Sequence, residues 1–586
     1  MKNLLLLCLC FTACLAPPPG SGPVPLETHV ADWRDEVVYQ VLVDRFSNGD
    51  VNNDFGVLPG HLSRYQGGDW RGLTQKLGYL ESLGVTTLWI SPVVRNVETD
   101  ADFDAYHGYW AQDLTQPNPH FGDVTELRTL TTEAHARGMK VVLDIVTNHM
   151  GQVFFYDQNL NGTPDVYVGG SGSTSPVQRS SEFDPDFDSR GVQVFTSLGV
   201  AGQAPIVFFD RPEIARERPH PDVLGSARAY HGLGRTLDYE DPKQLLEGDF
   251  PGGLKDVATE LPEVREAMVD SYARWAELVD LDGFRIDTVK HVEHEFWQVF
   301  THDVRARLAA QGKEKFLMFG EAFDGRDELL GSFTRPGELD SVFYFSQHFA
   351  VFRDVFQFAH DAGKQKGTRQ IESLWAARPV NWSNEPQVGG TGLAPSKLPV
   401  NFLDNHDVAR FLFGAQRDVA ALRNALTLLM TEEGLPCLYY GTEQDFDGGN
   451  DPANREVMWK SGFDTGGETF RHVAKLTALR KQFPALRRGD TRVIFSTDHT
   501  GDEVDAGLFA FERTGGDAGA SYALVVSNTN GRQESSTVLM TTRPAGSALV
   551  DVLGGDKRKF IVGSQGQVNV AVGAQQSLIL IPAFTE

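Results

Sequence analysis

Cysteine is scarce in this chain, which holds four cysteines in 586 residues, and three of them precede residue 15. The fourth, Cys437, lies in the apolar run 436–440, where we expect a buried thiol that packs like a small apolar side chain. A disulfide within the folded part of the chain is therefore not expected, and packing or a bound metal must supply the stabilisation that a disulfide would give.

Positive charge and long apolar runs are also in short supply. The chain has 53 Lys and Arg against 79 Asp and Glu, and its net charge of −26 argues against nucleic acid and anionic membranes as partners. The apolar run 4–11 is too short to span a bilayer as a helix. A neutral polymer needs no basic surface and fits this composition.

The amino terminus has the features of a targeting segment. Lys2 precedes the apolar run, and Phe11-Thr12-Ala13-Cys14 resembles the cleavage box of bacterial lipoproteins, although Phe11 departs from the usual leucine. Ordinary signal-peptidase cleavage is the alternative. We expect 1–14 to be a signal and 15–34 a Pro/Gly-rich linker. Either route exports the protein, as a secreted monomer or as an outer-membrane or cell-surface lipoprotein whose lipid anchor is its one membrane contact.

Strand-like and helix-like segments alternate through the middle of the chain. The clearest helix is 263–279, where Val264, Met268, Tyr272, Trp275 and Val279 form one apolar stripe. The candidate strands between helices are 37–43, 85–91, 140–147, 283–289, 316–321, 341–345, 398–403 and 436–441. This alternation predicts an α/β fold with a parallel sheet.

One strand carries an unusual pair of charges. In 283–291, Arg285 and Asp287 are two residues apart and leave the same face of the strand. Since a buried carboxylate is costly unless it is paired or used, the arginine is expected to keep Asp287 ionised, as a covalent nucleophile requires. A structural Arg–Asp pair is the alternative for this segment alone. By contrast, Glu321 follows the apolar run 316–319, a setting that favours a protonated acid.

Four such strand ends occur in order, at 141–149, 283–291, 320–323 and 402–407. Together they resemble the four signature regions of the α-amylase family, glycoside hydrolase family 13, over residues 35–586. The resemblance implies a (β/α)8 TIM barrel with its site at the carboxyl ends of the strands. It further implies barrel segments 35–149 and 238–488, an inserted irregular domain B at 150–237, and a C-terminal antiparallel β-sandwich, domain C, at 489–586.

The chemistry that follows is retaining hydrolysis of a glycosidic bond, which needs one carboxylate nucleophile and one carboxylic acid. Their surroundings assign Asp287 as the nucleophile and Glu321 as the acid. By resemblance, Asp407 is the third catalytic carboxylate, and His149 and His406 hydrogen-bond the sugar.

Further sugar contacts match the family more loosely. The motif 105–110 has a counterpart whose tyrosine stacks on the sugar, with a core aromatic cluster as the alternative, and Asp451 with Arg455 could equally be a surface ion pair. The substrate-binding residues implied by resemblance, beyond the two histidines above, are Arg285, His107, Tyr109, Lys290, His291, Asp451 and Arg455.

Two loops are rich in the oxygen ligands that Ca²⁺ prefers. The first resembles an amino-terminal calcium site of cyclodextrin-processing relatives, with ligands Asn48, Asp50, Asn53, Asp54, Gly67 and Asp69, and an Asn/Asp-rich turn is its alternative. The second starts like an EF-hand with Asp157, Asn159, Asn161 and Asp165, but Val168 takes the place of the closing glutamate. A shortened calcium loop and a metal-free turn remain equal alternatives there.

The resemblance implies an exported enzyme that hydrolyses α-1,4-glucosidic bonds in starch or maltooligosaccharides. A transglycosylase of the same family, acting on or forming cyclodextrins, is the runner-up. The chain has Gly232 or Gly234 where cyclodextrin-forming relatives carry a bulky aromatic residue, which favours hydrolysis. A non-catalytic glucan-binding lipoprotein is the third hypothesis, weakened by the presence of every catalytic acid.

Overall fold

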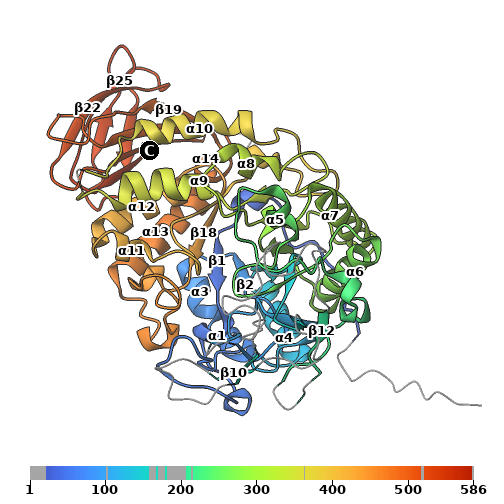
Figure 1. Cartoon of the computed structure of the whole chain (residues 1–586). Coiled ribbons are helices and arrows are strands. Elements are labelled where there is room, and N and C mark those ends of the chain that lie inside the picture. Colours follow the sequence, from blue (N-terminus) through green and yellow to red (C-terminus); the bar gives the residue numbers. More distant parts are fainter. Residues whose placement is uncertain are drawn as a thin grey trace, which may run out of the picture.

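The computed structural model describes residues 22–583 except 101–102, 158–165, 169–177, 181–205, 211, 213–214, 362 and 517–520. Two parts are visible in Figure 1: a barrel ringed by helices, and a C-terminal group of strands at one end, next to α10 (Arg369–Asn381) and α12 (Val419–Thr431). Within those described ranges, no helix is both long and apolar enough to cross a membrane.

The eight predicted strands are confirmed as one parallel sheet. In sheet order they are β16 (Ser341–Val342), β15 (Leu317–Gly320), β14 (Gly283–Ile286), β7 (Lys140–Ile145), β2 (Thr87–Ile90), β1 (Val38–Val41), β18 (Leu435–Tyr439) and β17 (Val400–Phe402). A parallel bridge between Phe343 and Val400 joins the two ends and closes the barrel. Apart from Lys140 at the start of β7, every residue of these strands is buried, which explains their continuous apolar runs in the sequence.

Helices alternate with these strands and cover the barrel. They are α1 (Val43–Phe46), α2 (Trp70–Gln75), α3 (Leu77–Leu83), α4 (Val124–Ala136), α6 (Pro262–Val279), α7 (His294–Ala309), α8 (Asp327–Ser332), α9 (Phe345–Gln347) with a π-helical turn (His348–Gln357), α10, α11 (Phe411–Gly414), α12, α13 (Glu468–Gln482) and α14 (Pro484–Arg488). The predicted stripe on 263–279 is the buried face of α6, which starts with Pro262 and ends at Asp280 in the left-handed region, φ 59°.

The connection from β7 to α6 forms the irregular insertion. Its elements, in chain order, are β8 (His149–Met150), β9 (Phe154–Tyr156), β10 (Val166–Val168), β11 (Gln178–Ser180), β12 (Ile206–Phe208), α5 (Pro242–Glu247) and β13 (Lys255–Asp256). Since β13 pairs antiparallel with β8, the non-barrel stretch continues to Leu261, past the expected end at residue 237. The ammonium of buried Lys255 lies 3.2 Å from the carboxylate of Asp249 and over the ring of Tyr156.

The C-terminal strands form an antiparallel sheet in the order β19 (Asp490–Phe495), β20 (Leu508–Thr514), β21 (Tyr522–Asn528), β26 (Ser577–Pro582), β23 (Ala548–Asp551) and β24 (Lys559–Ile561). A second pair, β22 (Ser535–Met540) and β25 (Gln567–Val572), packs its apolar residues against this sheet around one core, as the predicted sandwich requires. Buried Arg513 of β20 donates hydrogen bonds to the carbonyls of Thr431 at the end of α12 and of Gly489.

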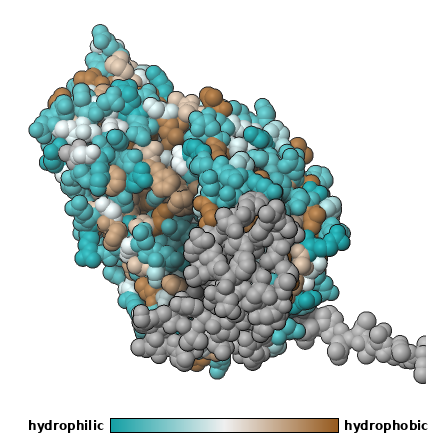
Figure 2. All heavy atoms as spheres, in the orientation of Figure 1, coloured by the Kyte–Doolittle hydropathy of each residue, from teal (hydrophilic) through white to brown (hydrophobic). Residues whose placement is uncertain are grey.

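Figure 2 shows that the face of Figure 1 is mostly hydrophilic and is hollowed near its middle, where apolar side chains gather. Cys437 is buried in β18, as expected, and is a free thiol.

Candidate active site

A cleft of about 380 Å³ opens where the barrel strands end. It is lined by Phe103, Tyr106, His107, Tyr109, Trp110, His149, Phe250, Pro251, Leu254, Asp287, Thr288, Lys290, His291, Glu321, Phe323, His406, Asp407, Asp451 and Arg455. The structure therefore brings together every catalytic and substrate-binding residue predicted from the sequence except Arg285, which lies fully buried beneath the cleft. Their strand-end positions account for this, because the carboxyl ends of a parallel barrel meet on one face.

Arg285 is the shared partner of three carboxyl groups. One guanidinium nitrogen lies 2.8 Å from both Asp144 and Asp287, and the other lies 2.7 Å from Glu321. The expected contact between Arg285 and Asp287 is present, and neighbouring strands β7, β14 and β15 place two further acids around the same guanidinium. The planar, forked guanidinium suits this bridging role.

Burial, rather than the arginine, dominates the protonation of both acids. Burial raises the pKa of Glu321 well above its usual range, and the nearby Asp287 and Asp407 charges add to the rise while Arg285 opposes it. Burial also raises the pKa of Asp287, to about 6, with Arg285 again opposing. The carboxyl groups lie within hydrogen-bonding reach of each other. With a pKa of about 6, Asp287 is mostly ionised near neutral pH, and burial favours the protonated form of Glu321 that a proton donor requires.

Asp144 is a buried residue beside Arg285 that the sequence analysis did not single out. Its carboxylate accepts hydrogen bonds from Arg285, from the Tyr109 hydroxyl at 2.7 Å and from the Trp89 indole at 3.1 Å. It thereby fixes the tyrosine that borders the cleft. A charged residue in the apolar strand 141–146 was the available signal, of the same kind that identified Asp287.

The cleft histidines are neutral hydrogen-bonding groups. Burial lowers the pKa of His149 to about 3 and of His291 to about 4, and it lowers the pKa values of His107 and His406 strongly as well. The Nδ1 atoms of His107 and His406 accept hydrogen bonds from the Tyr109 amide and from Gln40. Both imidazoles therefore carry their proton on Nε2, as a donor.

Two of these histidines take their places from aromatic packing. The ring of His406 stacks on Tyr109 with centroids 5.2 Å apart, and His149 stacks on Phe250 at the same separation. The His149 imidazole lies against the Tyr109 backbone, and its buried Nε2 atom makes no hydrogen bond of good geometry within the described part of the chain.

One end of the cleft is organised by Arg455. Its guanidinium lies 3.2 Å from Asp407 and 3.1 Å from Asp451, and donates a hydrogen bond to the Tyr106 hydroxyl. The Asp451–Arg455 pair is thus part of the cleft rather than an isolated surface ion pair. Tyr106 is a second residue that the sequence motif contained without its role being recognised.

Lys290 and His291 border another part of the cleft, in the 3-10 turn η6 (Val289–His291). Lys290 donates to the carbonyl of Phe323 at 2.6 Å, and the Nδ1 of His291 lies 3.1 Å from the carbonyl of Leu245. Thr288, just before this turn, has φ 48°, a strained conformation for a β-branched residue that directs the chain away from Asp287.

The insertion contributes an apolar wall. Phe250, Pro251 and Leu254 line the cleft, whereas Gly232 and Gly234 do not. The glycines thus add no aromatic side chain to this wall of the cleft. Sequence reasoning missed Phe250 because the segment that carries it has no periodic pattern.

The first predicted calcium loop contains buried amide oxygens. The Oδ1 atoms of Asn48 and Asn53 are buried without a hydrogen-bond partner in the described ranges. Gly67 is so close that a Cβ there would lie 2.5 Å from Asp54. Asp50 is paired with Arg71 and caps η2 (Val51–Asn53), and Asp69 caps α2 by accepting from Gly72. The orphaned amide oxygens fit a hard cation.

In the second predicted loop, Asp157 is buried at the end of the described segment 103–157. The other three proposed ligands, Asn159, Asn161 and Asp165, lie outside the described residues.

Comparison with known proteins gives consistent matches. Residues 40–477 match the family model described as the α-amylase catalytic domain. The chain is 31% identical to an α-amylase of Streptomyces lividans over 90% of its own length, and it spans 57% of that protein. It is 30% identical to a cyclomaltodextrin glucanotransferase of Geobacillus stearothermophilus, over 92% of this chain and 66% of the relative.

Solved structures agree. The α-amylase of Geobacillus thermoleovorans, determined in complex with acarbose, superimposes with a TM-score of 0.69 at 25% identity, over 95% of this chain and the whole of that one.

Proposed function

Because the chain belongs to the α-amylase family, as the match of its residues 40–477 to the catalytic-domain model shows, we propose that it hydrolyses α-1,4-glucosidic bonds with retention of configuration. Starch and maltooligosaccharides are the proposed substrates. The observation that carries the proposal is the arrangement of Asp287 and Glu321: two buried carboxyl groups in one cleft, both in ion-pair contact with Arg285.

The first step uses both acids. The ionised Asp287 attacks the anomeric carbon, and Glu321 gives its proton to the glycosidic oxygen as the bond to the leaving sugar breaks. The second step reverses the proton transfer: the Glu321 carboxylate takes a proton from water, and the resulting oxygen displaces Asp287 from the sugar. The close approach of the two groups supports retention, because an inverting pair needs a gap of about 6.5–9.5 Å for the attacking water.

The surrounding residues supply binding and positioning. We assign Asp407 to the sugar hydroxyls beside the reacting bond, with neutral His149 and His406 as hydrogen-bond donors. Arg285 holds Asp287 and Glu321 in place from below. Tyr109 offers an aromatic face, and His107, Lys290, His291, Asp451 and Arg455 extend the contacts along the cleft.

The direct test is Glu321→Gln, assayed by release of reducing ends from soluble starch. Loss of the proton donor is expected to lower kcat by about 10²- to 10⁴-fold. Glu443→Gln is the matched control, because this buried glutamate accepts hydrogen bonds from Tyr39 and Tyr79 outside the cleft. Near-normal starch hydrolysis by a folded Glu321→Gln variant would overturn the assignment.

Transfer to another sugar is the second candidate, supported by the similarity to a cyclomaltodextrin glucanotransferase. The same covalent intermediate would then be intercepted by a sugar hydroxyl instead of water. Chromatography of the products from soluble starch, maltotriose and β-cyclodextrin separates the two, because cyclic products or products longer than the substrate exclude simple hydrolysis.

We also propose that Ca²⁺ stabilises the loop at Asn48, Asn53, Asp54 and Gly67, with Asp50 and Asp69 bracing it. The unpartnered amide oxygens support this assignment, and bound calcium is common in the family. Export, with or without acylation of Cys14, remains the proposal made from the sequence; that cysteine lies outside the described residues.

A further inference from the structure

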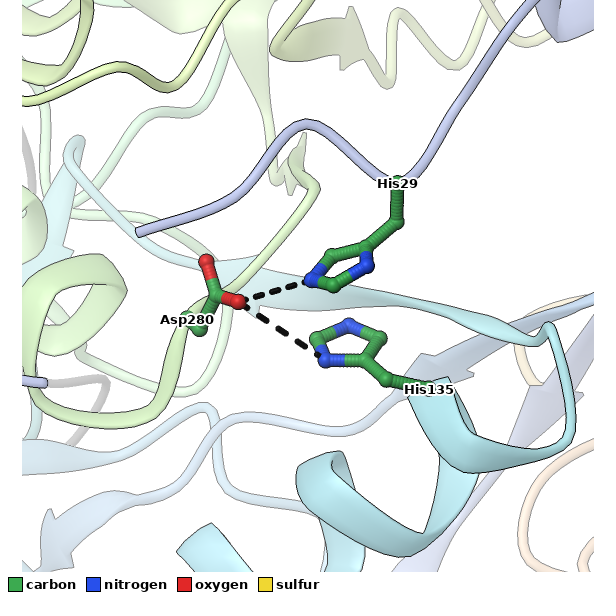
Figure 3. A group of neighbouring side chains, drawn as sticks. All are labelled: His29, His135 and Asp280. Atoms are coloured by element: carbon green, nitrogen blue, oxygen red, sulfur yellow. Dashed lines mark hydrogen bonds and ion pairs between the residues drawn. The ribbon is translucent and has the colours of Figure 1, made fainter. Parts of the chain in front are cut away.

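At the opposite end of the barrel from the cleft, three side chains from distant parts of the sequence converge. They are His29, from the segment that runs across the base of the barrel, His135, in the last turn of α4, and Asp280, at the end of α6 (Figure 3). The left-handed conformation of Asp280 ends the helix and turns its carboxylate toward both imidazoles. The catalytic cleft uses none of these residues.

The donor atoms are close enough to share one ion. The carboxylate oxygen of Asp280 lies 2.7 Å from Nε2 of His29 and 3.8 Å from Nδ1 of His135. All three atoms fall within 4.8 Å of one another. A tetrahedral Zn²⁺ with bonds of about 2.0 Å holds its donors about 3.3 Å apart, so small side-chain adjustments suffice. The two imidazole rings are stacked with centroids 3.6 Å apart, which aligns their nitrogens on one side.

A second carboxylate orients His135. Its Nε2 lies 2.8 Å from Asp282, a buried residue that also accepts from the Val141 amide. As the donor in that contact, Nε2 keeps the proton, which leaves the lone pair of Nδ1 directed at the Asp280 carboxylate. Metal binding would use this Nδ1 lone pair and the Asp280 oxygen 3.8 Å from it as two of the ligands. A carboxylate that holds the far nitrogen of an imidazole is also the usual support of a metal-binding histidine.

The charge balance leaves room for a dication. Lys313 lies 2.7 Å from the other oxygen of Asp280 and 2.8 Å from Asp282, and so neutralises one of the two carboxylates. Among Asp280, Asp282 and Lys313, one negative charge remains at the cluster. The side chains of His29, His135 and Asp280 are 22%, 11% and 12% exposed, so an ion can enter from solvent and keep a water as its fourth ligand.

We propose that His29, His135 and Asp280 form a binding site for a divalent transition metal, with Zn²⁺ as the best match to two imidazoles and one carboxylate. Binding replaces the proton on Nε2 of His29 and releases it to solvent. The ion connects the segment around His29 to α4 and to the end of α6, and so cross-links the amino-terminal segment to the base of the barrel.

The experiment uses the full chain with excess Ca²⁺, which fills the oxygen-rich loops, and equilibrium dialysis against Zn²⁺ or Co²⁺. About one equivalent is expected to bind, with the visible absorption of tetrahedral Co²⁺ coordinated by nitrogen and oxygen. His29→Ala should abolish both signals, because His29 is in a peripheral segment and its loss leaves the barrel intact. His302→Ala, at an exposed His–Asp pair on α7, should retain both.

Absence of stoichiometric binding to the unmodified chain would overturn the proposal and leave the cluster as a set of His–Asp ion pairs. Undiminished binding by both His29→Ala and a second ligand variant, His135→Asn, would overturn it equally. Starch hydrolysis is not the readout, so failure here leaves the proposed enzyme function untouched.

Discussion

Substituting Arg285 by lysine tests how the buried cation tunes the cleft. Arg285 lowers the pKa values of Asp287 and Glu321 against a larger rise from burial. A lysine ammonium is a single point charge and cannot bridge three carboxylates as the guanidinium does. Both pKa values should therefore rise, and each unit of rise corresponds to about 1.4 kcal/mol of lost differential stabilisation.

The sign of the effect on activity follows from the roles of the two acids. Asp287 must be ionised, so a higher pKa removes activity on the acid side; Glu321 must be protonated, so a higher pKa extends activity on the alkaline side. With the acid limb starting near the Asp287 pKa of about 6, a rise of one unit reduces the ionised fraction at pH 6 by about fivefold. The acid and alkaline limbs of the pH–rate profile report the apparent pKa values of Asp287 and Glu321 as an interacting pair. Both limbs should therefore shift together toward higher pH.

The assay is kcat/KM for a chromogenic aryl maltooligosaccharide from pH 4 to 9. Arg305→Lys is the control, since Arg305 is a buried arginine paired with Asp340 away from the cleft. It should cost stability without displacing the pH profile. A profile of Arg285→Lys that is lower in height but unchanged in position, or displaced toward acid, would refute the reasoning.

Three further changes have defined outcomes. His149→Ala should lower kcat/KM by about 10- to 100-fold without moving the pH profile, because a neutral donor of about 1–3 kcal/mol is lost; a shifted acid limb would show that the imidazole carries charge. Chelation of calcium should lower the unfolding temperature of the unmodified chain but not of Asp54→Ala, since an ion at about 100 times its Kd contributes about 2.7 kcal/mol; equal shifts in both would place the ion elsewhere. Lys255→Met should destabilise the fold by about 3–5 kcal/mol in urea unfolding, because it removes one charge of a fully buried ion pair, the ammonium 3.2 Å from the Asp249 carboxylate; an unchanged midpoint would contradict this.

The barrel and the catalytic acids could be predicted from the sequence for a common reason. Strands buried on both faces are continuous apolar runs, and an acidic residue that interrupts or ends such a run stands out, as Asp287 and Glu321 do. The eight strands were found within a few residues of their bounds, because period and burial are local properties.

What could not be predicted depends on contacts between distant segments. The sharing of Arg285 among three acids arises from the sheet register, which pairs β7, β14 and β15 side by side. Phe250 lines the cleft through the irregular path of the insertion, where no periodicity marks a buried position. His29 and Asp280 are 251 residues apart, and neither lies in a recognisable motif.

The guanidinium of Arg513 has a consequence for any attempt to trim this protein. It extends from the terminal sandwich to the end of α12, where it donates a hydrogen bond to the carbonyl of Thr431. A truncated chain ending at residue 489 would leave that carbonyl without this donor and would expose apolar residues of α12 to water. A minimal catalytic fragment is thus a poor engineering goal. Grafts that exchange the last hundred residues should carry an equivalent arginine across the junction.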